Sequence, residues 1–305
     1  MRPLFLTSLV SLLILSPSIS SALQVMGHRG ARGEFSENTI PGFLHALNIG
    51  VDSLEMDVRM SSQGELIVVH NEKIPKEACH FSPKTPQAIR QRKSHRIDSF
   101  TAQELTYLQC DKKLKKFPLQ KTLSSATLSS LRLTLKTILA APGGDKVRFS
   151  IEMKPNGLPI PIKFGLSPKA EPFAKKLWDI ISEFQLQDRV HIDSFVPDYL
   201  KALKAMAPNV KLTFSLLPIV GFFQYFFATY NEDKVFFHRI HLMSKGLSDF
   251  MVQAVIHKAH DLGQEVFIND RQQKAEWQHY LTLGVDGFCT DYPSQLLNFR
   301  LKNKH

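Results

Sequence analysis

The size and charge of this chain exclude several classes of protein. Its 305 residues are 43% hydrophobic and 10% aromatic, which is enough to bury a large core and excludes disorder of the whole chain. The formal net charge of +10 and the pI of about 9.4 favour anionic partners, such as phosphate-bearing small molecules or anionic membrane surfaces. Nucleic acid is not an expected partner, because the basic stretches lack the interleaved aromatic residues of a binding platform.

The first 22 residues are predicted to be a signal peptide. Arg2 supplies a positive start, an apolar run follows from Leu4 to Leu15, and small residues precede the expected cleavage point after Ala22. We therefore expect an exported protein, periplasmic or secreted. An uncleaved membrane anchor is the alternative, although the run is shorter than the ~20 apolar residues of a spanning helix.

From residue 23 to residue 305, short apolar strands alternate with amphipathic helices. Strands are predicted at residues 23–26, 53–58, 66–70, 147–153, 190–194, 210–215, 235–240, 265–268 and 285–290, and helices at residues 40–49, 134–141, 172–184, 197–206, 247–262 and 273–283. This alternation implies a parallel sheet, and about eight such units predict a closed (β/α)8 TIM barrel. An open doubly wound sheet is the alternative, but its glycine-rich nucleotide motif follows none of the early strands.

Residues 71–130 interrupt the alternation. They contain 12 Lys and Arg against 5 Asp and Glu, so we predict a basic insertion on the barrel rim, with a hydrophobic pattern too weak for a core of its own. Cys79 and Cys110 both lie in this insertion, and we expect an exported chain to bridge them, which would pin the loop beside His70. Two free thiols in a chain that is never exported are the alternative. Cys289 is predicted to be a buried core residue.

Polar side chains end several of the predicted strands, and the active site of a barrel is built at the carboxyl ends of its strands. These residues are His28, Arg29, Glu55, Asp57, His70, Glu152, Lys154, Asn269, Asp270 and Asp291. Glu55 and Asp57 are two residues apart and therefore project from the same side of their strand. Glu37 and Asn38 are expected to fix the loop after the first strand and to cap a helix that begins near Thr39.

This set of side chains suits the cleavage of a phosphodiester. Carboxylates from two strands favour a hard divalent cation, Ca²⁺ or Mg²⁺, over Zn²⁺, which prefers His and Cys. The cation together with Arg29 and Lys154 would neutralise a phosphate, and Asn269 would contact the substrate. His28 and His70 would act as base and acid, because an imidazole titrates near neutral pH.

The motifs that carry these residues resemble those of the glycerophosphodiester phosphodiesterase family. The chain reads GHRG, then SENT, SLEMDV and ELIVVHNE, with IEMKP in the middle and GVDGFCTDYP near the end. The family pattern is HRG, ENT, ExDV, a strand ending in HD, an E-x-K strand and a terminal GVDG-x-x-TD-x-P. The resemblance implies a barrel with a rim insertion, a divalent metal held by Glu55, Asp57 and Glu152, and acid–base work by His28 and His70.

The chain departs from the family pattern at three places. Ser36 stands where the family usually has Pro before ENT, which affects the shape of the loop. Asn71 replaces the usual Asp of HD, so the support that this Asp would give is weakened or moved to Glu72. The late strand ends in Phe267, Ile268 and Asn269 where relatives often have W-T-x-N. The reaction class is therefore better defined than the substrate.

The expected activity is hydrolysis of glycerophosphodiesters to glycerol 3-phosphate and an alcohol. The resemblance implies that the glycerol hydroxyl next to the phosphoester attacks phosphorus first, and that water then opens the cyclic phosphate. The sequence leaves open which histidine is the base, which metal is native, which head group is preferred and what the oligomeric state is.

The apolar stretch from Leu216 to Tyr230 allows a second interpretation. It is either a buried helix or an apolar rim that admits a lipid tail or rests on a membrane, helped by the basic run from Lys112 to Lys116. The rim would favour a phospholipase D-like hydrolase of lysophospholipids or sphingomyelin. A third hypothesis is a catalytically silent, exported ligand-binding barrel, and its support is the Asn71 replacement.

Overall fold

The computed structural model describes residues 23–156, 170–227, 237–269 and 272–303. The predicted signal peptide, residues 1–22, lies outside them. Eight parallel strands form a closed barrel, because β1 pairs with both β2 and β11. The barrel strands are β1 (Gln24–Gly27), β2 (Ser53–Met60), β6 (Arg148–Met153), β7 (Val190–Ser194), β8 (Lys211–Leu216), β9 (Arg239–Leu242), β10 (Glu265–Ile268) and β11 (Gly287–Thr290). The predicted (β/α)8 barrel is confirmed.

One predicted strand lies outside the barrel. Strand β3 (Leu66–Val68) runs antiparallel to the last three residues of β2, where Val58 pairs with Val68. The turn between the two strands contains Gly64, whose φ of 78° suits glycine. A connection this short cannot make the crossover that a parallel neighbour needs, so the chain reverses and descends along β2. The predicted strand over residues 66–70 is therefore present, but it ends at Val68 and runs antiparallel to β2 instead of joining the parallel barrel.

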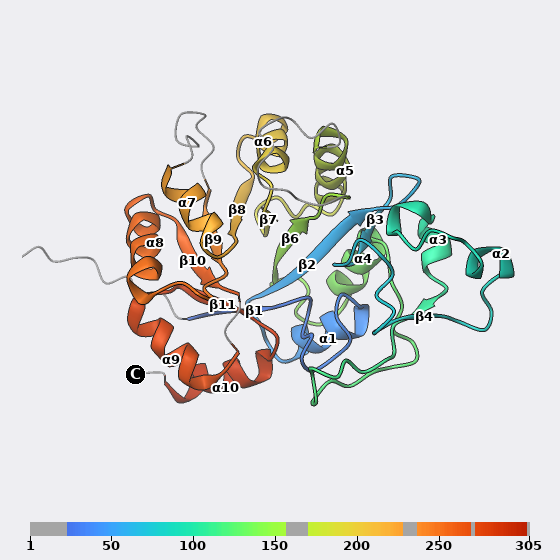
Figure 1. Ribbon diagram of the computed structural model, residues 1–305, viewed down its shortest axis with the longest axis horizontal. Helices are drawn as coiled ribbons and strands as arrows, with labels where there is room; N and C mark the ends of the chain where they lie inside the picture. Colours follow the sequence, from blue (N-terminus) through green and yellow to red (C-terminus); the bar gives the residue numbers. More distant parts are fainter. Residues whose placement is uncertain (1–22, 157–169, 228–236, 270–271, 304–305) are drawn as a thin grey trace, which may run out of the picture.

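Helices cover the outside of the barrel (Figure 1). They are α1 (Ile40–Asn48), α4 (Leu131–Ala140), α5 (Ala170–Glu183), α6 (Pro197–Met206), α7 (Val220–Phe227), α8 (Asp249–Asp261), α9 (Lys274–Leu283) and α10 (Pro293–Lys302). Thr39, Ser130 and Ser248 cap the amino ends of α1, α4 and α8 through their hydroxyl groups. Among the described residues, no helix has the length and apolar character needed to cross a bilayer.

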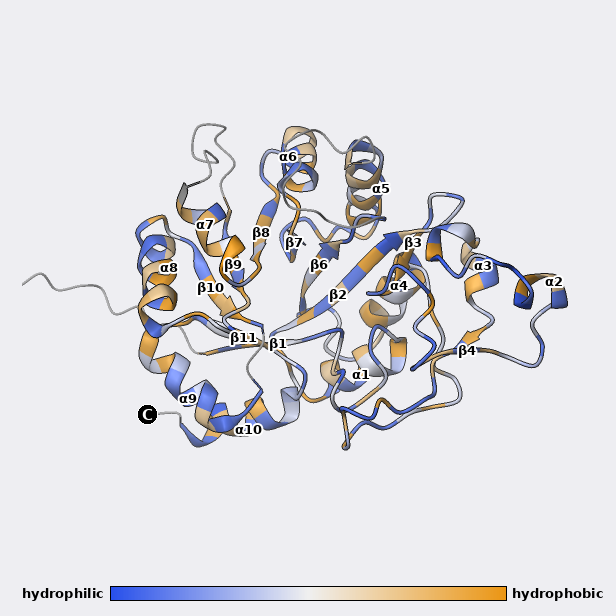
Figure 2. Ribbon diagram, in the orientation of Figure 1, coloured by the Kyte–Doolittle hydropathy of each residue, from blue (hydrophilic) through white to orange (hydrophobic). Residues whose placement is uncertain are grey.

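The two faces of the barrel strands differ in polarity. On β2, Leu54, Met56 and Val58 belong to the core between barrel and helices, whereas the alternating Glu55 and Asp57 are buried and polar. Figure 2 shows this alternation as blue and orange blocks along β2. The outward face thus supplies the packing, and the inward face is free to carry charge.

The basic insertion of residues 71–130 extends to one side of the barrel, at the right in Figure 1. It contains β4 (His80–Phe81), α2 (Gln87–Arg90), the 3-10 helix η1 (Ile97–Ser99), α3 (Ala102–Leu105) and β5 (Leu108–Gln109). The insertion has a hydrophobic core of its own, which includes Ile97, Phe100 and Leu108. The expectation that the insertion would lack a core of its own was wrong. Its apolar residues follow no regular period in the sequence, so the sequence pattern does not reveal that they meet in the folded chain. The predicted Cys79–Cys110 disulfide is present, and Cys289 is buried and free.

Candidate active site

Three buried carboxylates meet at the carboxyl ends of β2 and β6. Ligand oxygens of Glu55, Asp57 and Glu152 all lie within 4.8 Å of one another. The register explains this proximity, because Asp57 and Glu152 are direct neighbours in the β2–β6 ladder and Glu55 lies on the same face of β2. The strand ends therefore bring together the predicted ligand set, here called the acidic cluster.

Burial opposes the ionisation of the carboxylates in the acidic cluster. Burial, and then the neighbouring Asp57, raise the pKa of Glu55 well above its usual range. Burial also raises the pKa of Glu152 to about 7, against the opposing effect of Lys154. Burial acts the same way on Asp57, but Lys154 and Arg29 outweigh it and hold the pKa of Asp57 well below its usual range. A hard divalent cation fits such a set, because it would stabilise all three carboxylates in their charged forms.

Two cations border the acidic cluster. The Arg29 backbone N–H donates to Glu55 Oε2 at 2.7 Å, and its guanidinium Nε lies 3.2 Å from Asp57 Oδ2. Lys154 Nζ lies 2.6 Å from Glu152 Oε1 and 3.3 Å from Asp57 Oδ1. Both predicted phosphate-binding cations thus lie at the carboxylates, where they would also meet a phosphate held by a metal.

His28 is backed by a carboxylate. It follows β1 directly, and its Nδ1 lies 2.6 Å from Oδ1 of Asp291, which follows the neighbouring β11. Because a carboxylate can only accept a hydrogen bond, Nδ1 carries its hydrogen toward Asp291. Nε2 is then the nitrogen left to exchange protons, and it lies 3.9 Å from Glu55 Oε2. Burial lowers the pKa of His28, although Asp291 opposes this effect. Asp291, which the sequence placed among the strand-end residues without a role, is therefore positioned to orient His28.

His70 is backed by a neutral amide. Its Nδ1 lies 3.0 Å from Oδ1 of Asn71, and burial lowers the pKa of His70 to about 3. The antiparallel β3 returns the chain to the barrel mouth, where Val69 N–H donates to the Asp57 carbonyl at 2.9 Å. Glu72 does not take over the role of the missing Asp, as it pairs with Arg96 instead.

The loop after β1 also serves the site. Glu37 bridges two cations, at 3.0 Å from Arg29 Nη1 and 3.1 Å from Arg32 Nε. Asn38 has a φ of 53° and donates from Nδ2 to Asp57 Oδ2 at 2.7 Å. The expected capping role of Asn38 was wrong, because Thr39 caps α1 and Asn38 orients Asp57. No pattern in the sequence distinguishes these two uses of an Asn before a helix.

Asn269 follows β10 at the same mouth. Its backbone N–H donates to the Leu242 carbonyl at 3.2 Å, which holds it at the strand end. Its side-chain Oδ1 is buried and has no hydrogen-bond partner among the described residues. Asn269 therefore offers an acceptor to a ligand, whereas Asp270 lies outside the described residues.

The fold and this site together define a class of protein. A TIM barrel whose mouth combines an acidic cluster, two flanking cations and two histidines is suited to metal-assisted hydrolysis of a phosphate ester.

Comparison with known proteins defines the family. The glycerophosphoryl diester phosphodiesterase family matches residues 28–295, and the chain belongs to this family. A glycerophosphodiester phosphodiesterase of Bacillus altitudinis is 23% identical over 281 residues, which are 92% of this chain and 99% of the relative. The match confirms the resemblance that the motifs indicated.

Two solved structures share the fold. A protein of Silicibacter pomeroyi DSS-3, assigned as a glycerophosphoryl diester phosphodiesterase, gives a TM-score of 0.77 at 21% identity over 93% of this chain and 94% of its own. An Oleispira antarctica phosphodiesterase, solved with the product sn-glycerol-3-phosphate, gives 0.68 at 17% identity over 90% and 96%.

Proposed function

We propose that this protein is a metal-dependent phosphodiesterase that hydrolyses glycerophosphodiesters to glycerol 3-phosphate and an alcohol. The observation that carries the proposal is the acidic cluster flanked by His28 and His70, each held through Nδ1 by a neighbouring side chain. Family membership and the product in the Oleispira antarctica structure support the same substrate class. An intact cluster with both histidines also favours an enzyme over a silent binding barrel.

Glu55, Asp57 and Glu152 would hold Ca²⁺ or Mg²⁺, because all three donors are carboxylate oxygens. When bound, the cation supplies positive charge to the phosphate. Arg29 and Lys154, each already in contact with the cluster, would orient the phosphate between the two histidines.

The two histidines would move the protons. The glycerol hydroxyl next to the phosphoester loses its proton to one imidazole, and its oxygen bonds to phosphorus to give a cyclic phosphate. The other imidazole donates a proton to the oxygen of the departing alcohol. Water then opens the ring, and the proton flow reverses through the same pair, which returns both histidines to their starting states.

The test is an assay of glycerol 3-phosphate release from glycerophosphocholine and glycerophosphoethanolamine. Chelation should abolish the release, and Ca²⁺ or Mg²⁺ should restore it. Glu55→Gln and Asp57→Asn should weaken metal affinity far more than the melting temperature, because metal binding depends on the full carboxylate charge. Full activity in excess chelator, with no metal detected in the protein, would overturn metal dependence.

A second candidate, hydrolysis of lysophospholipids or sphingomyelin, is favoured by one surface. Leu217, Ile219, Val220 and Phe223 are exposed where β8 leads into α7, at the mouth end of the barrel. With the basic insertion, this apolar surface would make peripheral contact with a membrane. An acyl requirement in the same assay distinguishes the two candidates, because a glycerophosphodiesterase acts without an acyl chain.

The predicted export remains part of the proposal. The Cys79–Cys110 disulfide supports it, because structural disulfides persist mainly in oxidising compartments. The amino-terminal sequence of the mature protein would test the cleavage after Ala22.

A further inference from the structure

A second group of metal-binding atoms lies beside the acidic cluster. A ring nitrogen of His28, a carboxylate oxygen of Glu55 and Sγ of Cys289 all lie within 4.8 Å of one another. The three residues lie on adjacent barrel strands or directly after one, because β1 pairs with both β2 and β11. Unlike the acidic cluster, this set combines nitrogen, oxygen and sulfur. We call it the mixed cluster.

Cys289 faces the inside of the barrel. Its neighbour Phe288 belongs to the core between barrel and helices, so the alternation of β11 turns Cys289 inward. There it forms a small apolar cluster with Met26 and Phe267. Cys289 thus packs as a core residue, and its Sγ also lies near two polar groups of the active site.

The hydrogen bond to Asp291 prepares His28 to bind a metal. Nδ1 of His28 lies 2.6 Å from Asp291 Oδ1 and carries its hydrogen toward it, so Nε2 keeps a lone pair. This Nε2 lies 3.9 Å from Oε2 of Glu55. A histidine that ligates a metal almost always donates its other ring N–H to a carboxylate, a carbonyl or water. The Asp291–His28 pair has this arrangement independently of Cys289, so it is a second observation that points to a cation.

The donor atoms of the mixed cluster select the metal. Zn²⁺ is bound tetrahedrally by His nitrogen, Cys sulfur and carboxylate oxygen, and three protein ligands leave its fourth position open. Tetrahedral bonds of about 2.0–2.3 Å place the ligand atoms about 3.4–3.6 Å apart, so the 3.9 Å between Nε2 and Oε2 has to close by only about 0.5 Å. Ca²⁺ and Mg²⁺ prefer oxygen ligands and are not suited to the sulfur.

A cation reaches the mixed cluster by the same route as the acidic cluster, because Glu55 belongs to both. Cys289 is completely buried, but His28 is 9% exposed and lies at the barrel mouth. A single ion also needs no large cavity, since it occupies the space between its ligands. Burial raises the pKa of the Cys289 thiol well above its usual range, so only a metal that bonds strongly to sulfur displaces the thiol proton to water.

We propose that His28, Glu55 and Cys289 form an inhibitory site for Zn²⁺. An ion at this site occupies the lone pair of His28 Nε2 that proton transfer requires, and it draws Glu55 away from the acidic cluster. The inhibition rests on the proposed function, whereas the binding rests only on the three ligands. Ca²⁺ and Mg²⁺ compete with Zn²⁺ for Glu55.

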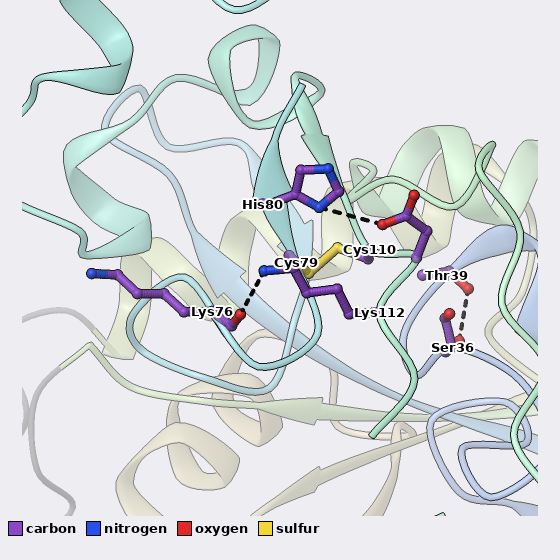
Figure 3. The surroundings of a disulfide bond; sticks show 8 residues. Ser36, Thr39, Lys76, Cys79, His80, Cys110 and Lys112 are labelled. Atoms are coloured by element: carbon purple, nitrogen blue, oxygen red, sulfur yellow. Dashed lines mark hydrogen bonds and ion pairs between the residues drawn. A yellow bond between two sulfur atoms is a disulfide. The ribbon is translucent and has the colours of Figure 1, made fainter. Parts of the chain in front are cut away.

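The test uses the sulfur atom as a spectroscopic probe. The chain has three cysteines, and Cys79 and Cys110 are joined in a disulfide (Figure 3), so Cys289 holds the one free thiol. A thiolate-to-metal charge-transfer band on addition of Cd²⁺ or Co²⁺ therefore reports Cys289. We expect the wild type to show this band with one equivalent of metal, and Zn²⁺ to displace the Co²⁺ band.

Two variants separate the clusters. Cys289→Ser should abolish the band and weaken Zn²⁺ binding by at least about tenfold, since even the loss of a residue that supports a ligand costs this much. Glu152→Gln is the matched control, because it removes a carboxylate of the acidic cluster and no ligand of the mixed cluster. It should keep the band and lose affinity for Ca²⁺ or Mg²⁺. Cys289→Ala keeps the side chain small and apolar and covers a failure of Cys289→Ser to fold.

The consequence for activity is measured as release of glycerol 3-phosphate. Zn²⁺ should inhibit the wild type, excess Ca²⁺ or Mg²⁺ should relieve the inhibition, and Cys289→Ser should need at least about tenfold more Zn²⁺ for the same relative inhibition.

Several results would overturn the proposal. Absence of the band in the wild type, or its persistence in Cys289→Ser, would refute the site. Loss of the band in Glu152→Gln would show one joint site instead of a separate mixed cluster. A band without inhibition of an active wild type would refute the inhibitory role. If the wild type hydrolyses no glycerophosphodiester, the proposed function fails, and the band in wild type and Cys289→Ser still decides whether the metal site exists.

Discussion

The two histidines at the barrel mouth are held by different kinds of structure. His28 and its partner Asp291 follow β1 and β11, which are paired parallel strands of the barrel. His70 and its partner Asn71 follow β3, which lies outside the barrel, and Asn71 begins the insertion that the disulfide crosslinks. One side of the site is therefore built by the barrel itself, and the other by an addition to it.

This difference separates two requirements. The barrel side combines the charged partner with the acidic cluster, so its geometry is tied to the strand register. The insertion side has a neutral partner and its own hydrophobic core, so its geometry depends on contacts outside the barrel ladder. The strand register therefore fixes the charged side of the site, and the insertion contributes its neutral side.

The largest expected effect tests whether both sides are needed. His28→Ala and His70→Ala should each lower kcat by about 10²–10⁴-fold, the usual loss for a general acid or base, with an unchanged melting temperature. The exposed His257 of α8 supplies a control, since His257→Ala should leave kcat as it is. Near-normal turnover of either catalytic variant would remove that histidine from the mechanism.

A smaller effect is expected when the disulfide is removed, because this should destabilise the insertion side of the site and leave the barrel side unchanged. Replacing Cys79 and Cys110 with Ser opens a loop with a sequence separation of 31, and loop-closure entropy predicts a loss of about 3–4 kcal/mol in the free energy of unfolding. The loss should appear in the insertion as faster amide hydrogen exchange, while metal affinity of the acidic cluster stays constant. Alkylation of both cysteines in the non-reduced, exported wild type, detected by mass spectrometry, would show that the bridge is absent in solution.

The smallest effect is a pair of opposite shifts in pH dependence. Asn71→Asp places a negative charge beside His70, stabilises its imidazolium and raises its pKa, so the limb of the kcat/KM profile due to His70 should move up by about one pH unit. Asp291→Asn removes the charge beside His28, so the limb due to His28 should move down, with a loss of about tenfold or more in kcat. Shifts in the same direction would show that the two sides do not differ as the structure indicates.

Local patterns in the sequence were sufficient to predict the barrel and the three carboxylates of the acidic cluster. The two-residue alternation of β2 places Glu55 and Asp57 on one face, whatever the rest of the chain does, because side chains of a strand project alternately to its two faces. Parallel pairing then brings Glu152 to them, since the carboxyl ends of parallel strands share one edge. The family motifs carried the same residues, so sequence and structure agree at this part of the site.

Only the tertiary structure decided which side chains pair in the site and how the chain brings His70 to the barrel mouth. Asn38 could cap a helix or orient Asp57, and the choice depends on a φ of 53° and a contact across 19 positions. The insertion acquires its core from apolar residues without a regular period, so no sequence window reveals which of them meet. His70 reaches the mouth because a short turn makes β3 antiparallel, and strand direction depends on the space that a connection can cross rather than on the strand's own residues.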